Sequence, residues 1–475
     1  MAKNKKTKIL ATLGPATNTK EIISELIDAG VNVFRINFSH AEYDNVKARI
    51  KDIREINEEK NFHVAILGDL QGPKLRVGVM EENVILRDND TFVFTTDKCI
   101  GNKEKAFMTY QNFPRDVQKG ENILVDDGKL MFEVVSTNKK NEVTTKVIVG
   151  GILSSKKGVN LPNTKISLPA LTEKDMKDAI FAIEQKVDWI ALSFVRNPED
   201  LRKLHDLISQ KSEYRIPVIA KIEKPEAVQN IDALIPYCDG LMVARGDLGV
   251  EIPMQEVPLI QKLLVRKAKS ARIPVIIATQ MMETMITNAV PTRAEVNDVA
   301  NSIMDGADAL MLSGETSVGA HPIKVIEKMS EIIKSVENSP LIKVPQAPPH
   351  IRTDRFITKA ICHHAALMAN DVKATAISTL TNSGYTAFQI SAWRPTSTIL
   401  AFSSEKRILA KMSLLWGVRS FFYDKNVSTD DTVVDINLIA KKRGYVATND
   451  YVINLTSMPV EAKGMVNTLR VSQIK

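Results

Sequence analysis

Short apolar runs of this chain end in side chains that bind metals, neutralise anions or move protons. Two carboxylates, Glu223 and Asp247, follow neighbouring runs, and hard oxygen ligands with room left for water and substrate suit magnesium. Lys221 precedes Glu223 by two residues, and a lysine there suits the charge on a transferring phosphoryl group. The run ends together supply Arg35, Asn37, Ser39 and His40, then Asp69, Lys221 and Glu223, then Arg245, Gly246 and Asp247, then Thr279 and Gln280, and finally Ser313, Gly314 and Glu315.

Three of these residues have competing interpretations. Lys221 and Glu223 lie two apart on one strand, so both point to the same side and could instead form a salt bridge that lines the sheet. Thr279 could donate to a substrate carboxylate or relay a proton, and it could equally bond a neighbouring carbonyl. Gly246, in the string ARGDLG, lets backbone N–H groups approach an anion closely.

The elements that must position these residues are apolar runs separated by amphipathic stretches. Continuous apolar character indicates strands buried on both faces, as in parallel sheets, and the stretches 19–30 and 258–274 have the periodicity of helices. Eight such units predict a (β/α)8 TIM barrel, whose strand ends converge on one mouth. The eight runs are TKILATLG, VNVFRINFSH, FHVAILGDL, VDWIALSFVR, IPVIAKIEKP, DGLMVARGDLG, IPVIIATQMME and ADALMLSGET.

One segment interrupts the alternation of barrel strands and helices, and another follows it. Between the third and fourth runs, alternating strands with Asp-Asn-Asp, Asp-Asp-Gly and Gly-Gly turns predict a small inserted all-β domain. The proline-rich stretch 338–352 predicts a surface linker, after which strand–helix alternation predicts an open α/β domain. We therefore expect a barrel catalytic domain from 1–72 and 168–340, an inserted β-barrel lid domain over 73–167, and a C-terminal regulatory or oligomerisation domain over 341–475.

The composition narrows the function classes. The chain has 475 residues and a net charge of +7, but its basic excess is spread without a long Lys/Arg block, which favours a small anionic substrate over nucleic acid. Its three cysteines are far apart, which favours a reducing, cytoplasmic location. The basic N-terminus has no signal-peptide core, and no run approaches the roughly 20 apolar residues of a membrane span. Cys362, His363 and His364 are adjacent, so on a helix they point in different directions and do not predict a metal site.

Longer strings are specific enough to indicate a family. The chain resembles the pyruvate kinases in six strings taken together. These are FRINFSH, VIAKIEKPEAVQNID, LMVARGDLGVEIP, IIATQMMETM, PTRAEVNDVANSIMDGADALMLSGET and KKGVNLPN. The resemblance spans nearly the whole chain, including the inserted domain and the C-terminal domain. It implies a glycolytic kinase that transfers the phosphoryl group of phosphoenolpyruvate to ADP, giving pyruvate and ATP, with Mg²⁺ or Mn²⁺ as cofactor.

The resemblance also implies a role for individual residues. Lys221 stabilises the transferring phosphoryl group, Thr279 is near the enolate carbon that is protonated, and Arg35 contacts the phosphoryl group. Magnesium is held by Glu223 and Asp247, and a second magnesium arrives with the nucleotide. Substrate-binding positions are Arg35, Lys221, Gly246, Asp247 and Thr279; nucleotide-binding positions are Asn37, Phe38, Ser39, His40, Arg76 and Lys157. The inserted domain is expected to close over the mouth and exclude water.

The segment DLQGPKLRV departs from the pattern of most pyruvate kinases. Those enzymes read Asp-Thr-Lys-Gly-Pro-Glu here and need potassium, which is held at the positions of Asn37, Ser39 and Asp69 and by the carbonyl at Leu70. In this chain the glutamate is Lys74, the Thr-Lys pair is Leu70-Gln71, and Val77 replaces a common threonine. A tethered ammonium supplies the positive charge that a glutamate would recruit as an ion, so we expect potassium not to be required. The competing interpretation is that Lys74 points to solvent at the lid hinge and potassium still binds.

The resemblance places the family's effector loop in the C-terminal domain. In this chain the loop is formed by Thr381, Asn382, Ser383, Gly384, Tyr385 and Thr386. Backbone amides at a helix N-terminus favour phosphate, yet the loop has Asn382 and Tyr385 in place of bases. We therefore expect a sugar-monophosphate or nucleotide effector, or none, ahead of fructose-1,6-bisphosphate. The competing interpretation is an ordinary capped helix with no ligand. The resemblance further suggests a homotetramer.

Two other functions compete with the kinase. A magnesium-dependent aldolase or lyase acting on pyruvate-like substrates could use the same barrel, but it has no use for the nucleotide motif FRINFSH or for the inserted lid. A scaffold built on a dead barrel would have lost Lys221, Glu223 or Asp247, and all three are present.

Overall fold

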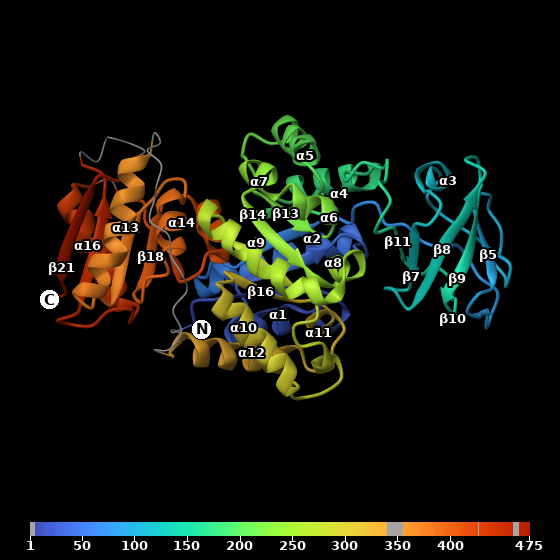
Figure 1. Ribbon diagram of the computed structural model, residues 1–475. Coiled ribbons are helices and arrows are strands. Elements are labelled where there is room, and N and C mark those ends of the chain that lie inside the picture. Colours follow the sequence, from blue (N-terminus) through green and yellow to red (C-terminus); the bar gives the residue numbers. More distant parts are fainter. Residues whose placement is uncertain (1–4, 340–354, 426, 459–464) are drawn as a thin grey trace.

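The chain forms three sheet-containing bodies in a row, with a barrel in the middle (Figure 1). The structure is a computed structural model that describes residues 5–339, 355–425, 427–458 and 465–475. The inserted β body, coloured cyan, lies on one side of the barrel, and the C-terminal body, orange to red, lies on the other. Among the described residues no helix is long and apolar enough to cross a membrane.

The central body is a closed barrel of eight parallel strands, as the eight apolar runs predict. Each run contributes one strand, and the strands follow the barrel in the order β1-β16-β15-β14-β13-β12-β3-β2. The strands are β1 (Lys8–Thr12), β2 (Val33–Asn37), β3 (Ala65–Asp69), β12 (Trp189–Leu192), β13 (Val218–Ile222), β14 (Gly240–Ala244), β15 (Val275–Ala278) and β16 (Ala309–Leu312).

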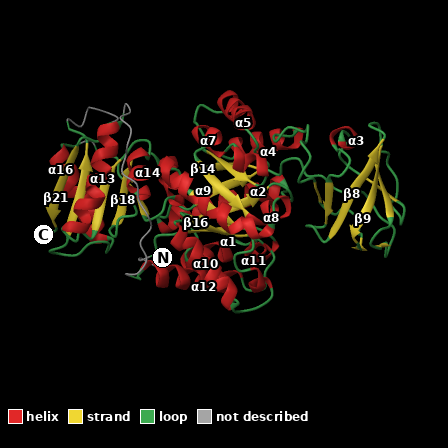
Figure 2. Ribbon diagram, viewed as in Figure 1, coloured by secondary structure: helices red, strands yellow, loops and turns green. Residues whose placement is uncertain are grey.

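Helices cover the outside of this barrel (Figure 2). The stretch 19–30 forms α1 (Lys20–Ala29), whose Thr19 hydroxyl accepts from the Ile22 N–H and whose C-cap is Gly30 at φ +127°. The stretch 258–274 corresponds to α9 (Val257–Ala271). The other long barrel helices are α2 (Tyr43–Lys60), α4 (Glu173–Glu184), α5 (Pro198–Lys211), α10 (Arg293–Asp305) and α12 (Pro322–Glu337).

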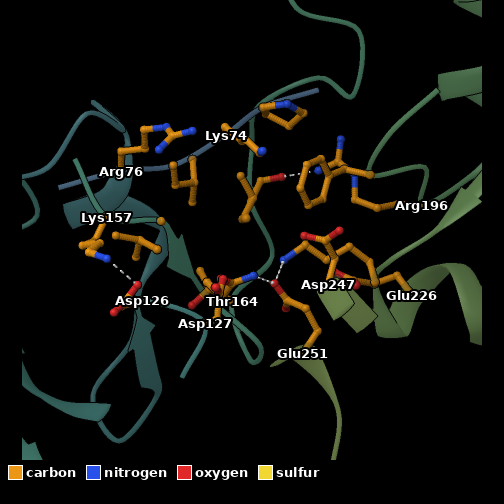
Figure 3. A pocket seen from close by; sticks show the side chains of 18 of the residues that line it. Lys74, Arg76, Asp126, Asp127, Lys157, Thr164, Arg196, Glu226, Asp247 and Glu251 are labelled. Atoms are coloured by element: carbon orange, nitrogen blue, oxygen red, sulfur yellow. Dashed lines mark hydrogen bonds and ion pairs between the residues drawn. The ribbon is translucent and has the colours of Figure 1, made fainter. Parts of the chain in front are cut away.

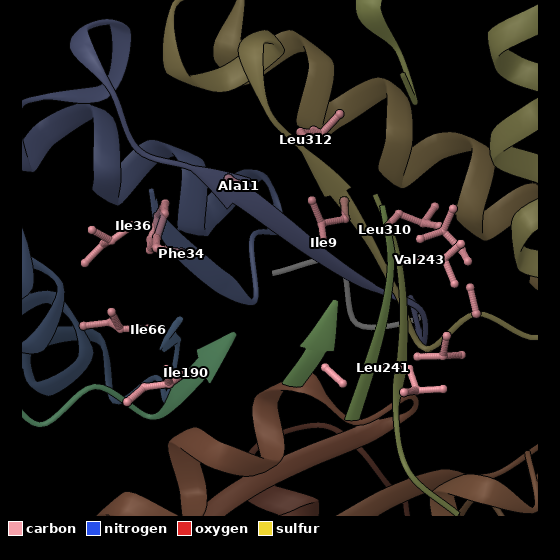
Figure 4. Close-up of a cluster of buried hydrophobic side chains, with 14 of the residues drawn as sticks. Ile9, Ala11, Phe34, Ile36, Ile66, Ile190, Leu241, Val243, Leu310 and Leu312 are labelled. Carbon is pink, nitrogen blue, oxygen red and sulfur yellow. The ribbon is translucent and has the colours of Figure 1, made fainter. Parts of the chain in front are cut away.

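The period of two along each strand divides the core into an outer and an inner layer. Ile9 and Ala11 of β1 belong to the large cluster that packs between strands and helices, which Figure 4 shows with Ile36, Ile66 and Leu310. Leu10, between them, belongs to the smaller cluster inside the barrel. The same alternation puts the side chains of Arg35, Asp69 and Lys221 on the inner face, above inner-layer residues of their strands.

The inserted segment forms a six-stranded sheet and a two-stranded one. The predicted Asp-Asn-Asp turn, at residues 88–90, lies between β4 (Ile85–Leu86) and β5 (Thr91–Thr95). The expected strands at 121–136 and 142–151 are found as β7 (Asn122–Val125), β8 (Leu130–Thr137) and β9 (Glu142–Val149). The sequence did not indicate β6 (Lys105–Phe107), α3 (Phe113–Asp116), β10 (Gly151–Ile152) or β11 (Val159–Asn160).

Two chain crossings join this inserted body to the barrel, and both are hydrogen-bonded. At the first crossing, the Gly72 N–H donates to Asp175 Oδ1 of α4 at 3.0 Å, and Gly72 has φ +71°. At the second, Arg196 donates from Nη1 to the Ile166 carbonyl and from Nη2 to the Leu168 carbonyl, both at 2.7 Å. The hinge therefore has fixed anchors on the barrel rim.

The C-terminal body is an open α/β sheet, with strand order β19-β18-β17-β20-β21 and one antiparallel edge pair. It lies against the amino end of the barrel, where Lys8 Nζ donates to the Val418 carbonyl and Trp189 Nε1 donates to the Lys411 carbonyl. Its elements are α13 (Phe356–Asp371), β17 (Ala376–Leu380), α14 (Tyr385–Ala392), β18 (Thr398–Ser403), α15 (Lys406–Lys411), β19 (Val418–Phe422), α16 (Thr429–Lys442), β20 (Tyr451–Thr456) and β21 (Thr468–Gln473).

The structure bears to different degrees on the expected linker, the domain limits and the cysteines. Most of the expected linker 338–352 lies outside the described residues. The domain limits at residues 72, 167 and 340 stay predictions, although all eight barrel strands fall within 1–72 and 168–340. Cys99, Cys238 and Cys362 are free thiols. His363 stacks on Trp393, with ring centroids 4.1 Å apart.

Candidate active site

The centre of the candidate site is a buried ion cluster at the carboxyl end of the barrel. Lys221 Nζ lies 2.9 Å from Glu223 Oε1 and 3.2 Å from Asp69 Oδ1. Arg35 Nε donates to Asp69 Oδ2 at 2.6 Å, and its Nη1 donates to Thr12 Oγ1 at 3.1 Å. β2, β3 and β13 therefore bring together Arg35, Asp69 and Lys221. Arg35 and Lys221 lie 186 positions apart in the chain.

The charges of this cluster depend on one another. Burial opposes the charged form of Lys221, yet Asp69 and Glu223 hold its pKa above the ordinary value. Burial would also raise the pKa of Asp69, but Lys221 and Arg35 hold it below the ordinary value. For Glu223, burial raises the pKa, repulsion from Asp247 adds to this, and Lys221 opposes it. The lysine is thus fixed as a cation at the bottom of the site.

Glu223 and Asp247 fit a divalent cation. The repulsion between them shows that their charges are close, and a cation between them would relieve it. Glu223 also accepts the Phe194 N–H at Oε2, 2.7 Å away, so its orientation is fixed, while Asp247 lines an open cavity. Within the described residues no group of three His, Cys, Asp or Glu side chains could hold a metal alone. A cation here would therefore take further oxygens from substrate and water.

Thr279 lies beside Gly246 in a strained backbone. Thr279 has φ +69° and Gln280 has φ +53°, an unfavourable region for a β-branched residue. The Thr279 hydroxyl accepts the Gly246 N–H at 2.7 Å and donates to the Ala278 carbonyl at 2.5 Å. The neighbouring-carbonyl bond that competed with a substrate role is therefore present, and the hydroxyl must release it before donating to a substrate.

Ser193 belongs to the same cluster and was missed by the sequence analysis. Its hydroxyl accepts from Lys221 Nζ and donates to the Leu70 carbonyl, both at 2.7 Å. It lies just after β12, so applying the strand-end rule to the fourth run would have found it. Phe194, which follows with φ +54°, directs its N–H at Glu223. The end of β12 thus positions both the lysine and the carboxylate.

The four potassium positions of the family lie together near this cluster. Asn37 is paired in register with Asp69, and Asn37 Oδ1 accepts the Ser39 N–H at 3.1 Å. The Leu70 carbonyl accepts the Ser193 hydroxyl. Asp69 accepts from Arg35 Nε, so three of the four positions that would bind potassium, Asn37, Asp69 and Leu70, already have hydrogen-bond donors.

The residues at the nucleotide positions are divided between two cavities. Asn37 and His40 line a cavity of ≈ 620 Å³ at the end of β1 and β2. Arg76 and Lys157 line a second cavity of ≈ 290 Å³ between the inserted body and the barrel. The side chain of Phe38 is buried against Gly68 and Phe181, so only its backbone can contact a ligand.

The second cavity is lined by Asp247, one of the two carboxylates that fit a divalent cation (Figure 3). Arg76, Lys157 and Asp126 approach from the inserted body, and Asp247, Glu226 and Glu251 approach from the barrel. Lys157 pairs with Asp126 at 2.9 Å. Glu251 accepts from Asn160 Nδ2 of the inserted body at 2.8 Å and from Lys224 Nζ of the barrel at 2.6 Å. This carboxylate therefore connects the two walls.

Lys74 lies at the edge of the same cavity (Figure 3). Its side chain is exposed to solvent but lies within the fields of Asp247 and Glu223, which favour its charged form. Desolvation, Arg76 and Lys221 act the other way and leave the pKa of Lys74 below its ordinary value. The ammonium of Lys74 is thus in contact with solvent and also within reach of the charges of the site. Neither interpretation, a tethered charge in the site or a lysine that points to solvent, describes its placement completely.

The expected effector loop connects β17 to α14. The Gly384 N–H donates to Thr381 Oγ1 at 3.0 Å, Gly384 has φ +81°, and the Tyr385 N–H donates to Ser383 Oγ at 3.4 Å. Thr386 is buried and Asn382 is exposed. The guanidinium of Arg355, at the start of α13, lies 4.5 Å from the centre of the Tyr385 ring. An arginine from another element therefore supplies a base that the loop itself lacks.

Comparisons with known proteins give a consistent result. Residues 4–326 match the family model described as "Pyruvate kinase, barrel domain", and residues 359–472 match "Pyruvate kinase, alpha/beta domain". A pyruvate kinase of Bacillus licheniformis is 41% identical over 98% of this chain and 80% of its own length. One of Mycobacterium intracellulare is 39% identical over 98% of both chains. The crystal structure of a pyruvate kinase from Cryptosporidium parvum superposes with a TM-score of 0.92 at 33% identity, covering 99% of this chain and 97% of its own.

Proposed function

Because this chain belongs to the pyruvate kinase family, we propose how its individual residues carry out the family reaction. The reaction is the transfer of the phosphoryl group of phosphoenolpyruvate to ADP, which gives pyruvate and ATP. Family membership decides against the magnesium-dependent aldolase or lyase that the barrel alone would permit. The observation that carries the assignment of roles is the buried Lys221 cluster beside Glu223 and Asp247.

In this proposal Lys221 neutralises charge on the phosphoryl group during transfer. Its ammonium is held by Asp69, Glu223 and Ser193, so it needs little reorganisation as charge develops. Arg35, oriented by Asp69, contacts the same phosphoryl group. Catalysis is then mainly positioning and charge neutralisation, as phosphoryl transfer requires.

Glu223 and Asp247 hold the divalent cation, Mg²⁺ or Mn²⁺. When bound, the cation supplies positive charge to the oxygens of the substrate. The N–H of Gly246 and the hydroxyl of Thr279 face the substrate carboxylate side, and Thr279 lies near the carbon that gains a proton after the transfer. Strain at Thr279 and Gln280 supports this role, because unfavourable backbone angles concentrate at functional sites.

The nucleotide lies between the two cavities in this proposal. Asn37, Ser39, His40 and the backbone of Phe38 contact it from the barrel, and Arg76 and Lys157 contact it from the inserted body. A second divalent cation arrives with the nucleotide. Closure of the inserted body over the mouth brings the two groups together and excludes water, which competes with ADP for the phosphoryl group.

A coupled assay tests the kinase reaction directly. The enzyme, with phosphoenolpyruvate and Mg²⁺, should form pyruvate only when ADP is added, with ATP in equal amount. Formation of pyruvate without ADP would contradict the assigned chemistry, and loss of activity on chelation of divalent cations should be reversed by Mg²⁺ or Mn²⁺.

We further propose that this enzyme does not require potassium. Lys74 supplies a tethered positive charge within the fields of Asp247 and Glu223, where most family members have a glutamate. The oxygens of Asn37 and Leu70 each already accept one hydrogen bond, which supports the proposal because it leaves each oxygen a single lone pair for a potassium ion.

The potassium proposal is tested with tetramethylammonium as the only monovalent cation. The unchanged enzyme should retain near-full turnover there. Lys74→Glu should reduce turnover in this buffer and regain part of it on addition of potassium. Lys156→Glu, a matched change of a lysine on the lid side of the same cavity, should not create a potassium response. Strong potassium activation of the unchanged enzyme would refute the proposal.

The effector of the C-terminal domain is proposed to be a sugar monophosphate or a nucleotide. The loop amides and Arg355 can hold one phosphate, whereas the loop itself offers no second base. A thermal-shift screen of phosphorylated metabolites separates the outcomes. Selective stabilisation by a monophosphate supports the proposal, selective stabilisation by fructose-1,6-bisphosphate contradicts it, and no stabilisation supports an ordinary capped helix.

The enzyme is also proposed to be a cytoplasmic homotetramer. One apolar surface contains Met254, Leu259, Leu263, Val290 and Val296, with Met254 78% and Leu259 69% exposed. A second, on α16 of the C-terminal body, contains Val434 and Leu438. In this proposal each of the two surfaces packs against its own copy, and two such contacts give a tetramer with three two-fold axes.

A further inference from the structure

A small cavity lies where the barrel meets the C-terminal body, far from the carboxyl-end mouth. It has a volume of ≈ 10 Å³ and is lined from the barrel by the end of α9 and the loops before β15 and β16. From the C-terminal body it is lined by α14 and the residues that follow it. Its polar lining consists of Lys269, Arg272, Asp308, Ser391 and Arg394.

Two cationic side chains of this cavity have donors with no protein partner. The side chain of Arg394 is only 4% exposed, and its Nη2 donates to the Gly306 carbonyl at 2.6 Å and pairs with Asp308 at 2.8 Å. Its Nε and Nη1 have no hydrogen-bond partner, and neither has Lys269 Nζ. Buried donors of this kind are rare in folded proteins, and a bound water or ion is the usual explanation.

The charges around the cavity are unbalanced. Lys269 and Arg394 share the carboxylate of Asp308, whose Oδ2 also accepts the Val275 N–H at 2.9 Å, and Glu337 adds a smaller attraction to Arg394. The Arg272 guanidinium is stacked over the Trp393 ring, 3.7 Å from its centre. Uncompensated charge away from water is costly, so this junction favours an additional negative charge.

We propose that this cavity binds one small anion of the halide class, with chloride as its ordinary occupant, held by Arg394 and Lys269. The cavity volume of ≈ 10 Å³ is small, and it suits a monoatomic anion better than a phosphate or a carboxylate. The anion would receive the unpartnered donors of both domains at once. It would therefore fasten the C-terminal body to the barrel beside β15, the strand that ends next to Thr279.

Titration of Lys269 supports the same site. Burial and the charge of Arg394 lower the pKa of Lys269 to about 7, with Asp308 opposing and Arg272 adding a smaller effect. An anion in contact with the ammonium would favour its charged form and offset much of this shift.

The first experiment measures thermal unfolding of the full chain while chloride replaces gluconate at constant ionic strength. The unfolding temperature should rise saturably with chloride, by about 1–2 °C for a chain of this size. Lys269→Met should keep the fold and remove the chloride response. Lys267→Met, which changes an exposed lysine of the same helix paired with Asp232, should leave the response intact.

A second measurement locates the anion. Crystals of the full chain grown with bromide should show an anomalous peak in the cavity, absent from crystals of Lys269→Met. Occupation by water alone, or bromide only at crystal concentrations without a saturable chloride response in solution, would overturn the proposal. A chloride response that persists in Lys269→Met would overturn it as well, since it would then come from another site.

Discussion

Lys221 has two functions that the competing interpretations of the sequence kept apart. Its ion pair with Glu223 is a structural contact inside the barrel, and the same contact fixes the ammonium as a cation. Asp69 and Ser193 complete the support. A residue can therefore be both part of a salt bridge and preorganised for catalysis, because the charges that hold it also keep it protonated.

Replacement of Lys221 by methionine should reduce kcat by three orders of magnitude or more, roughly 4 kcal/mol. The ammonium acts mainly on charge in the transition state, so binding of phosphoenolpyruvate through the divalent cation should persist. Steady-state kinetics with direct measurement of phosphoenolpyruvate binding checks this. An effect confined to KM, with kcat unchanged, would contradict the assignment, and Lys203→Met on the exposed side of α5 is the control.

His63, just before β3, should make stability depend on pH. Burial and the nearby charges of Lys406 and Arg443 lower its pKa to about 4. A base with a lowered folded pKa binds fewer protons than in the unfolded chain, so its contribution is complete above about pH 6.5 and decreases as the pH falls toward 4, by at most about 3 kcal/mol. The denaturant midpoint of His63→Gln should therefore fall less between pH 7 and pH 4.5 than that of the unchanged enzyme; equal falls would contradict this origin.

At the scale of elements, Glu251 connects the inserted body to the segments that bear Glu223 and Asp247, the carboxylates of the proposed metal site. It lies on α8 (Arg245–Glu251), the helix that contains Asp247, and it pairs with Lys224, the neighbour of Glu223. Its third contact is Asn160 of β11 in the inserted body. The position of the lid is thus linked by hydrogen bonds to the elements that are proposed to hold the divalent cation.

Loss of this link should loosen the lid. Asn160→Ala removes one hydrogen bond to a carboxylate, worth about 1–1.5 kcal/mol, so the KM for ADP should rise roughly 5- to 10-fold with a smaller change in kcat. Kinetics and small-angle scattering measure the two effects. Asn141→Ala, a lid residue bonded only within the lid, should change neither quantity. Equal behaviour of the two variants would show that the contact does not control the lid.

At the scale of the whole molecule, the barrel separates two bodies with different tasks. The inserted body faces the carboxyl ends of the strands, and the C-terminal body covers their amino ends (Figure 1). Arg394, just after α14, pairs with Asp308, which also bonds the first residue of β15. Any ligand that moves α14 therefore has a direct mechanical contact with the strand that ends at Thr279.

The proposed tetramer makes a prediction at this scale. Leu259→Glu places a charge on the exposed apolar surface of α9 and should shift the molar mass in solution to that of a smaller assembly. Light scattering after size-exclusion chromatography measures this. Ile152→Glu, a 61%-exposed residue of the inserted body, is the matched control. An assembly unaffected by Leu259→Glu would place the interface elsewhere.

The local pattern of the sequence determined the barrel and most of its mouth. Continuous apolar runs predict parallel strands, and parallel strands in a barrel place their carboxyl ends together, so Arg35, Asp69, Lys221 and Glu223 could be expected in one site before any coordinates. The helices α1 and α9 followed from periodicity in the same way, and α1 also from its capping residues. These features depend on neighbours in the chain, which the sequence contains directly.

Contacts between distant segments were decided only by the tertiary structure. The sequence could not pair Asn160 with Glu251, Arg355 with Tyr385, or Arg394 with Lys269, because each pair joins two elements or domains whose relative placement has no local signal. It could not show that Thr279 bonds Ala278, since backbone strain arises from packing around the residue. The sequence gives the chemical type of each side chain. The neighbours that determine the charge and orientation of that side chain are brought to it by tertiary packing.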